Sequence, residues 1–313
     1  AGARAMVNTA GGGFALMTEG LSLAGAIESP LVIHLAQRPA PATGLPTRTE
    51  QADLEMALYS GHGEFPRVIF APGTLQEAIT LTAKAFNIAD KYQVPVFILT
   101  DQYFLDMYSN ESEVDLKEFL PQYSITQTET DYKRYQLNKT GVSPRGIPGF
   151  GQGIVCVDSD EHNEGGYITE SASMRKNMVN KRLQKLQTMR EDLIDYKIVG
   201  KKNAAIVVIG WGSTFPMIKE AIEKLGRKDV TQIHCPQVYP LPEKLGEILK
   251  KAKTAIIVEN NATSQFGKLI RTQTGFNFAH RILKYDGMAF SVENIIQGLS
   301  EIIREIDKEE NNE

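Results

Sequence analysis

The chain has 313 residues, of which 42% are hydrophobic and 23% charged, as in an ordinary folded protein with a sizeable core. Since one domain typically holds roughly 100–200 residues, the length predicts two domains. The net charge of −4 gives no electrostatic reason to expect a nucleic acid or an anionic membrane as partner. The longest apolar runs, such as residues 204–211, are too short to span a bilayer.

The two cysteines, Cys156 and Cys235, lie in apolar surroundings typical of strands. They cannot hold an iron–sulfur cluster, which needs about four ligands, and they favour buried thiols in a reducing cytoplasm over a disulfide. The chain begins at Ala1 and has no basic-then-apolar secretory signal. We therefore expect a fragment or processed product of a cytoplasmic protein.

In chain order, short β-branched runs alternate with longer helical ones, which predicts an α/β fold with mainly parallel sheets. Strands are expected over 31–36, 66–73 and 94–100, and the third is apolar enough to be buried on both faces. Thr74 and Glu77 have the spacing of a capping box. A helix should therefore begin after Thr74.

Residues 109–170 are rich in glycine, proline and acidic turns, and such long excursions often act as lids or binding loops. An amphipathic helix over 173–193 should follow, with its lysines and arginines turned to solvent. The apolar face of this helix is predicted from five residues, namely Met178, Val179, Leu183, Leu186 and Leu193.

From about residue 200, strands and helices alternate again to the C-terminal region, with Gly226 ending one of the helices. We therefore predict a first domain over 1–195, which includes an excursion at about 109–195, and a second over 200–313. The stretch "GWGSTF" (210–215) joins a strand to a helix. A tight turn is favoured there over a phosphate site.

Two features of the first domain leave alternatives open. The triple glycine Gly11, Gly12 and Gly13 precedes a helix, so its backbone suits either close approach to a flat ligand or a tightly packed helix entry. His62 lies between glycines in a loop. It either faces an active site or, the favoured alternative, forms a local hydrogen bond.

The loop after the strand at 31–36 runs from Arg38 to Thr47 and contains three prolines, Pro39, Pro41 and Pro46. Ligands of open α/β sheets bind at the carboxyl ends of strands, where Arg38 is placed. A guanidinium on a stiff loop suits a carboxylate, with the Thr47 hydroxyl beside it. On spacing alone, a surface arginine in a rigid loop is the favoured alternative.

Several stretches together, in this order and spacing, resemble the alpha subunit of the 2-oxoacid:ferredoxin oxidoreductases, closest to the 2-oxoglutarate type. The resemblance covers nearly the whole chain. The stretches that carry it are 1–20, 37–54, 61–78, 94–103, 160–171, 178–186 and 209–214.

This resemblance implies an enzyme that cleaves a 2-oxoacid with thiamine diphosphate, passes two electrons through [4Fe–4S] clusters to ferredoxin, and releases CO₂ and acyl-CoA. The alpha subunit is expected to supply a pyrimidine-side domain and a transketolase C-terminal-like domain. The diphosphate, its Mg²⁺ and a [4Fe–4S] cluster belong to a separate beta subunit, in an α₂β₂ heterotetramer. This chain itself is expected to hold no metal.

By the same resemblance, Arg38 and Thr47 face the substrate, and Gly11 to Gly13 lie near the pyrimidine side of the cofactor. Asn163, in "EHNE", replaces the usual aspartate of an acidic loop that is mobile in the family. The family's catalytic glutamate and another substrate-facing threonine lie upstream of Ala1. The chain as given is therefore expected to be catalytically incomplete.

Two other functions stay open on the sequence. One is a non-catalytic binding or assembly protein built on the same two domains, which the missing glutamate favours slightly. The other is a transketolase-type or 2-oxoacid dehydrogenase-type enzyme, which uses the same cofactor without ferredoxin.

Overall fold

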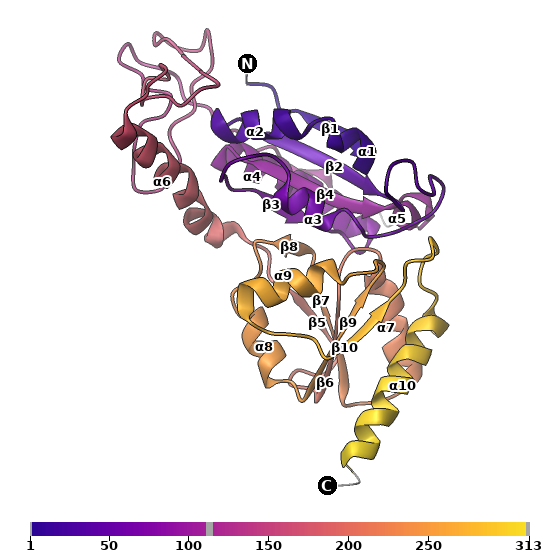
Figure 1. Ribbon diagram of the computed structural model, residues 1–313. Coiled ribbons are helices and arrows are strands. Elements are labelled where there is room, and N and C mark those ends of the chain that lie inside the picture. The colour runs from indigo at the N-terminus through magenta and orange to yellow at the C-terminus, as the bar shows by residue number, and fades with distance from the viewer. Residues whose placement is uncertain (1, 111–114, 311–313) are drawn as a thin grey trace.

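The computed structural model of the chain describes residues 2–110 and 115–310, which form two five-stranded sheets (Figure 1). The strand order is β1-β2-β4-β3-β8 in the first sheet and β10-β9-β6-β7-β5 in the second. Only β8 in the first sheet and β5 in the second pair in antiparallel fashion. The predicted α/β class with mainly parallel sheets is confirmed.

The first sheet consists of β1 (Met6–Ala10), β2 (Leu31–Gln37), β3 (Val68–Phe70), β4 (Pro95–Asp101) and β8 (Gln237–Tyr239). The helices that accompany it are α1 (Gly11–Ala15), α2 (Thr18–Ala26), α3 (Leu54–Tyr59), α4 (Leu75–Tyr92) and α5 (Gln102–Asp106). Every residue of β4 is buried, as its continuous apolar run predicted. One face of the sheet packs on α4, where Val32, Val68 and Val96 meet Leu81 and Ala85.

The start of α4 confirms half of the predicted capping box. The Thr74 hydroxyl accepts a hydrogen bond from the Glu77 backbone N–H at 3.1 Å. The Glu77 carboxylate, however, accepts from the Gly73 N–H at 2.7 Å and pairs with His234 and Lys197. Glu77 therefore joins α4 to the second sheet instead of completing the cap.

The excursion between the sheets contains η1 (Leu116–Phe119), α6 (Ala172–Thr188) and η2 (Met189–Asp192). Most of the rest is loop, with isolated bridges that pair Ile125 with Arg145 and Thr128 with Gly151. Figure 1 shows these loops beyond one end of the first sheet, with α6 leading back toward the second.

The predicted face of α6 is only partly right, since Leu186 packs against the core but three of the cations do not face solvent. Met178 is buried as expected, but Lys181, Arg182 and Lys185 are buried as well instead of facing solvent. The reason is that carboxylates from other segments meet these cations: Glu28 pairs with both lysines, and Glu161 pairs with Arg182. The helix is therefore held by buried ion pairs more than by an apolar stripe.

The second sheet consists of β5 (Lys197–Val199), β6 (Ile206–Gly210), β7 (Val230–His234), β9 (Thr254–Glu259) and β10 (His280–Leu283). The accompanying helices are α7 (Thr214–Leu225), α8 (Leu245–Lys251), α9 (Gln265–Thr274) and α10 (Val292–Glu310). Figure 1 shows α7 and α10 on one side of this sheet and α8 and α9 on the other. The turn over 210–215 contains Gly212 at a φ of 57°, in the left-handed region that favours glycine.

The two sheets share one apolar core. Residues of the first, such as Leu35 and Phe97, belong to the same buried cluster as Trp211 and Phe266 of the second. The strand β8 follows β7 in sequence but pairs with β3 of the first sheet, opposite Ile69 and Phe70. The predicted domain boundary near residue 200 stays a prediction, because β8 lies after this boundary in sequence but pairs with β3 of the first sheet. In the ranges 2–110 and 115–310, no helix has both the length and the apolar composition needed to cross a bilayer.

Candidate functional site

Arg38 follows directly on β2 at the carboxyl edge of the first sheet. Its neighbour Gln37 lies opposite Asp101, the last residue of β4, so two parallel strands end together here. Arg38 is half-buried, and its guanidinium forms no hydrogen bond or ion pair with the other described residues. A half-buried cation without an ion pair among the described residues suits an anionic ligand at this edge.

The loop after Arg38 is held in a tight fold. The Leu45 N–H donates to the Pro39 carbonyl at 3.2 Å. Gly44 has a φ of 54°, and a Cβ there would collide with the same carbonyl, so only glycine fits. This geometry agrees with the stiffness predicted from the prolines.

Thr47 is exposed, and within the described part of the chain its side chain has no hydrogen bond. The buried threonine of this segment is Thr49. Its hydroxyl donates to Asp101 Oδ1 at 3.1 Å and accepts from the Tyr103 N–H at 3.1 Å. The structure therefore places Arg38 and Thr47 on one loop with no hydrogen bond between their described side chains, and their role toward a substrate stays a prediction.

Gln51 fastens the end of this loop to the second sheet. Its backbone N–H donates to the Asn260 carbonyl at 2.7 Å, and its side-chain Nε2 donates to the Trp211 carbonyl at 2.9 Å. Its Oε1 accepts from the Asn260 N–H at 3.0 Å. Trp211 and Asn260 follow β6 and β9, so the carboxyl edges of both sheets meet at this loop.

Asp101 is another buried contact between the sheets. It accepts hydrogen bonds from Thr49, from the Phe104 N–H at 3.0 Å and from the Ser213 hydroxyl. Burial raises the pKa of the Asp101 carboxyl, and these hydrogen bonds act against that rise. Because Ser213 is engaged in this contact, the tight-turn interpretation of 210–215 is favoured.

The triple glycine begins α1, and its members differ. A Cβ on Gly11 would lie 2.7 Å from Asp53 Oδ2, and one on Gly13 would collide with Thr9. A Cβ on Gly12 would meet no atom within 4 Å. Tight packing therefore explains Gly11 and Gly13, while the exposed backbone of Gly12 fits the close approach of a flat ligand such as a pyrimidine ring.

Asp53 was not identified from the sequence, although aspartate just before an apolar helical run is a typical N-cap signal. It lies between the glycine stretch and Arg38 and is 6% exposed. Burial raises the pKa of the Asp53 carboxyl to about 6, against the attraction of Arg38. A carboxyl group that titrates so close to neutrality at a sheet edge is a candidate functional group.

The remaining candidates lie outside this edge. His62 Nε2 contacts Glu19 at 3.0 Å with both side chains exposed, so it has a partner, but one distant in sequence. The Asn163 amide oxygen accepts from the Gly165 N–H at 2.9 Å and so closes a turn of its own loop. Cys235 is buried as expected, whereas Cys156 is only half-buried.

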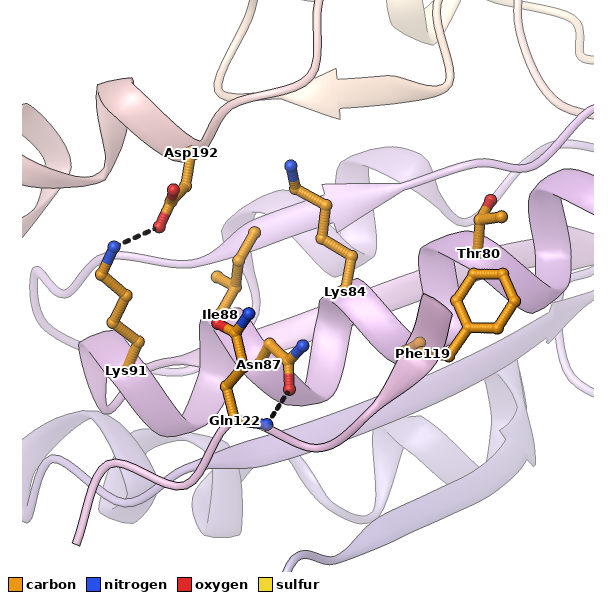
Figure 2. Close-up of a pocket in the computed structure, with 9 residues that line it drawn as sticks. Thr80, Lys84, Asn87, Ile88, Lys91, Phe119, Gln122 and Asp192 are labelled. Carbon is orange, nitrogen blue, oxygen red and sulfur yellow. Dashed lines mark hydrogen bonds and ion pairs between the residues drawn. The ribbon is translucent and has the colours of Figure 1, made fainter. Parts of the chain in front are cut away.

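A separate pocket of about 280 Å³ lies on the outer side of α4. Figure 2 shows Lys91 bonded to Asp192 and the Asn87 amide bonded to the Gln122 backbone along its wall. It is lined by later turns of α4, which lie toward the amino ends of the strands because the crossover helix runs antiparallel to them. In the part of the chain that the structure describes, no cluster of three or more His, Cys, Asp or Glu is arranged to hold a metal.

Comparison with known proteins shows to which family the chain belongs. Residues 1–181 match the family described as pyruvate flavodoxin/ferredoxin oxidoreductase, thiamine diphosphate-binding. The chain is 34% identical to the alpha subunit of 2-oxoacid:ferredoxin oxidoreductase 1 of Sulfurisphaera tokodaii, over 98% of this chain and 50% of the relative. It is 32% identical to the 2-oxoglutarate synthase subunit KorA of Methanocaldococcus jannaschii, over 83% of this chain and 70% of that subunit.

Among solved structures, the 2-oxoglutarate:ferredoxin oxidoreductase of Magnetococcus marinus, with 2-oxoglutarate, coenzyme A and succinyl-CoA bound, superposes with a TM-score of 0.89 at 28% identity. The match covers 96% of this chain and 53% of that one. The chain thus spans about half the length of the first of these relatives. On the extent of these matches, the chain belongs to the pyruvate flavodoxin/ferredoxin oxidoreductase family, whose thiamine diphosphate-binding region it contains.

Proposed function

We propose that this chain is part of the alpha subunit of a thiamine-diphosphate-dependent 2-oxoacid:ferredoxin oxidoreductase. The proposed reaction converts a 2-oxoacid, 2-oxoglutarate in the first instance, and coenzyme A to acyl-CoA and CO₂, with two electrons passed to ferredoxin. The likeness over 96% of the chain to an enzyme with 2-oxoglutarate and succinyl-CoA bound carries this proposal.

In this function Arg38 binds the carboxylate of the 2-oxoacid through its unpaired guanidinium, and Thr47 helps to orient the substrate from the far end of the same loop. A hydrogen bond to a charged group contributes about 1.5–3 kcal/mol. The buried bonds of Thr49 and Gln51 hold the loop, so less entropy is lost when the substrate binds.

Thiamine diphosphate, when bound, supplies the electron sink that decarboxylation of a 2-oxoacid requires. In this proposal the stretch Gly11, Gly12 and Gly13 lies at its pyrimidine side: the open face at Gly12 lets a flat ring approach the backbone, while Gly11 and Gly13 allow the tight packing that holds the stretch in place. The division near residue 200 into a pyrimidine-side domain and a transketolase C-terminal-like domain belongs to the same proposal.

The proposal also names partners. A beta subunit holds the diphosphate, its Mg²⁺ and a [4Fe–4S] cluster, and ferredoxin accepts the electrons. The complex is proposed to be an α₂β₂ heterotetramer in the cytoplasm.

The test uses the native complex, isolated anaerobically with the full-length gene product of this chain as bait. Coenzyme A-dependent reduction of a viologen dye is measured with 2-oxoglutarate, pyruvate and 2-oxoisovalerate in turn. Reduction with 2-oxoglutarate supports the whole proposal, and reduction with another acid corrects the substrate. A complex with no thiamine, no cluster and no activity would instead favour a binding or assembly protein.

A further inference from the structure

Gln37 is the last residue of β2 and directly precedes Arg38. The residue is 1% exposed, so its amide lies inside the protein, whereas Arg38 is half-buried at the edge of the sheet. An amide is costly to bury unless its donor and acceptor ends are hydrogen-bonded. Gln37 meets this condition with bonds to two other segments of the chain.

These two bonds close the loop that carries Arg38. Gln37 Oε1 accepts from the Asp53 backbone N–H at 3.0 Å, and Nε2 donates to the Thr100 carbonyl at 3.3 Å. Thr100 belongs to β4, and Asp53 directly precedes α3. The loop over 38–52 therefore starts next to Gln37 and ends at the Gln37 side chain, and one buried amide fixes both of its ends to the sheet.

Asp53 lies between the two parts of the proposed site. A Cβ on Gly11 would lie 2.7 Å from Asp53 Oδ2, so the carboxyl group packs against the entry of α1. The negative charge of Asp53 and the positive charge of Arg38 attract each other. Because Gln37 fixes the Asp53 backbone, it also sets the spacing between Arg38 and the triple glycine.

The residue types closest to glutamine in size lack part of this chemistry. Glutamate can accept from the Asp53 N–H, but when ionised it has no donor for the Thr100 carbonyl. Methionine has a similar length and neither group. Asparagine has the amide but is one methylene shorter, so it cannot reach both partners from the same backbone position.

We propose that Gln37 is a positioning residue for substrate binding: its amide holds Arg38 where the guanidinium meets the carboxylate of the 2-oxoacid, at a fixed spacing from Gly11. This inference rests on the proposed function, since the anion is the 2-oxoacid. Gln37 acts through Arg38 and does not itself contact the substrate. The loop is closed before the substrate arrives, so less entropy is lost on binding.

A glutamine with a purely structural role offers a matched control. Gln237 of β8 is 0% exposed, its Nε2 donates to the Pro240 carbonyl at 2.7 Å, and its Oε1 accepts from the Ile194 N–H at 3.1 Å. In the first sheet, β4 and β3 separate β8 from β2. Gln237 thus makes the same two kinds of buried bond without closing the Arg38 loop.

The experiment measures kcat, KM for the 2-oxoacid and KM for coenzyme A in the complete complex, for the wild type, Gln37→Met and Gln237→Met. Gln37→Met should raise KM for the 2-oxoacid about 3–10-fold, as expected for one neutral hydrogen bond, and change the other two constants less than about twofold. Gln237→Met should change all three less than about twofold. An unchanged KM for the 2-oxoacid in Gln37→Met, or an equal rise in Gln237→Met, overturns the inference.

A double-mutant cycle tests whether Gln37 acts through Arg38. In the Arg38→Ala background, Gln37→Met should change kcat/KM for the 2-oxoacid less than about twofold, because the group that it positions is gone. A purely structural effect would be additive. The same loss of kcat/KM in both backgrounds therefore contradicts the positioning role.

Gln37→Asn covers the case in which the Gln37→Met complex does not assemble. It keeps a polar amide at position 37 but cannot span both partners. The same rise in KM for the 2-oxoacid is expected, and it should again disappear in the Arg38→Ala background. A wild-type KM in Gln37→Asn overturns the inference.

These results separate the two proposals. A complex that reduces the dye with a 2-oxoacid but shows no coupling between Gln37 and Arg38 refutes the role of Gln37 alone. A complex that is inactive with every 2-oxoacid refutes the proposed function, and the role of Gln37 with it.

Discussion

Arg38 shows what a single residue contributes to this site. Its guanidinium is half-buried at the end of β2 and forms no ion pair with the described residues, while most buried cations of the chain, such as Lys181 and Lys185, have carboxylate partners. A guanidinium without an ion-pair partner can bind the carboxylate of a ligand through charge-assisted hydrogen bonds. The sequence predicts the place of this residue at a strand end, which is a local property, whereas its role toward a substrate is expected from the family resemblance.

Replacing Arg38 tests the proposed carboxylate clamp. In the complete complex, Arg38→Ala should lower kcat/KM for the 2-oxoacid about 10–150-fold, as expected for a loss of about 1.5–3 kcal/mol. The matched control Arg48→Ala, an exposed arginine of the same loop, should change it less than about twofold. Equal kcat/KM in the wild type and Arg38→Ala would show that the clamp does not exist.

Two other residues of the site could not be predicted in the same way. Thr49 and Asp53 lie in the stretch 37–54. Their importance depends on contacts with Asp101, Gly11 and the second sheet, which are distant in sequence. The sequence alone does not show that Thr49, and not Thr47, is the buried threonine of this stretch. Only the folded chain shows which hydroxyl is turned inward.

At the scale of elements, α6 is the clearest difference between sequence and structure. Its periodic leucines predicted a helix, which is correct, but the rule that cations face solvent failed. Glu28 lies 153 residues before Lys181 and contacts both lysines, at 2.7 Å and 2.5 Å. By contrast the start of α4 was predicted, because Thr74 and Glu77 are three residues apart.

The Glu28 cluster should be a major source of stability for the excursion. Breaking a buried ion pair leaves an uncompensated charge, so Glu28→Gln should lower the free energy of unfolding by about 3 kcal/mol or more. Urea unfolding of the full-length subunit measures this. Glu220→Gln, which removes an exposed pair with Lys224 on α7, should leave the midpoint nearly unchanged.

The same cluster predicts a pH dependence. Burial alone would raise the pKa of Glu28, but Lys185 and Lys181 outweigh it and lower the pKa to about 2. Because this pKa is below the ordinary value of 4.5, the stabilisation is complete above about pH 4.5 and is lost as the pH falls toward 2. Stability measured between pH 5 and 3 should therefore fall less steeply in Glu28→Gln than in the wild type, and parallel curves would contradict this.

At the scale of the whole molecule, the site depends on how the two sheets are joined. Gln51 bonds to residues after β6 and β9, Asp101 to Ser213, and Glu77 to His234 at 2.9 Å. Together with β8, these contacts bring the carboxyl edges of both sheets to the Arg38 loop. The sequence predicts both sheets from their alternating strands and helices, but not the contacts between them, because each joins residues more than a hundred positions apart.

Gln51→Ala tests this joining. It removes the side-chain bonds to Trp211 and Asn260 and leaves the buried Asn260 N–H without a partner, whereas the Trp211 carbonyl keeps the Thr214 hydroxyl, so the change should cost about 1–3 kcal/mol of unfolding free energy. KM for the 2-oxoacid should rise as well, because the loop loses its anchor. Gln152→Ala, at an exposed glutamine of the excursion, is the control, and an equal effect of both changes would refute the anchoring role.

The central claim is that this chain serves in a 2-oxoacid:ferredoxin oxidoreductase, and the stoichiometry of the reaction tests it most directly. The purified complex is supplied with 2-oxoglutarate, coenzyme A and oxidised ferredoxin under anaerobic conditions, and succinyl-CoA, CO₂ and reduced ferredoxin are measured together. We expect one succinyl-CoA and one CO₂ for every two electrons on ferredoxin. Acyl-CoA formed without reduction of ferredoxin, or no product from any 2-oxoacid, would contradict the account.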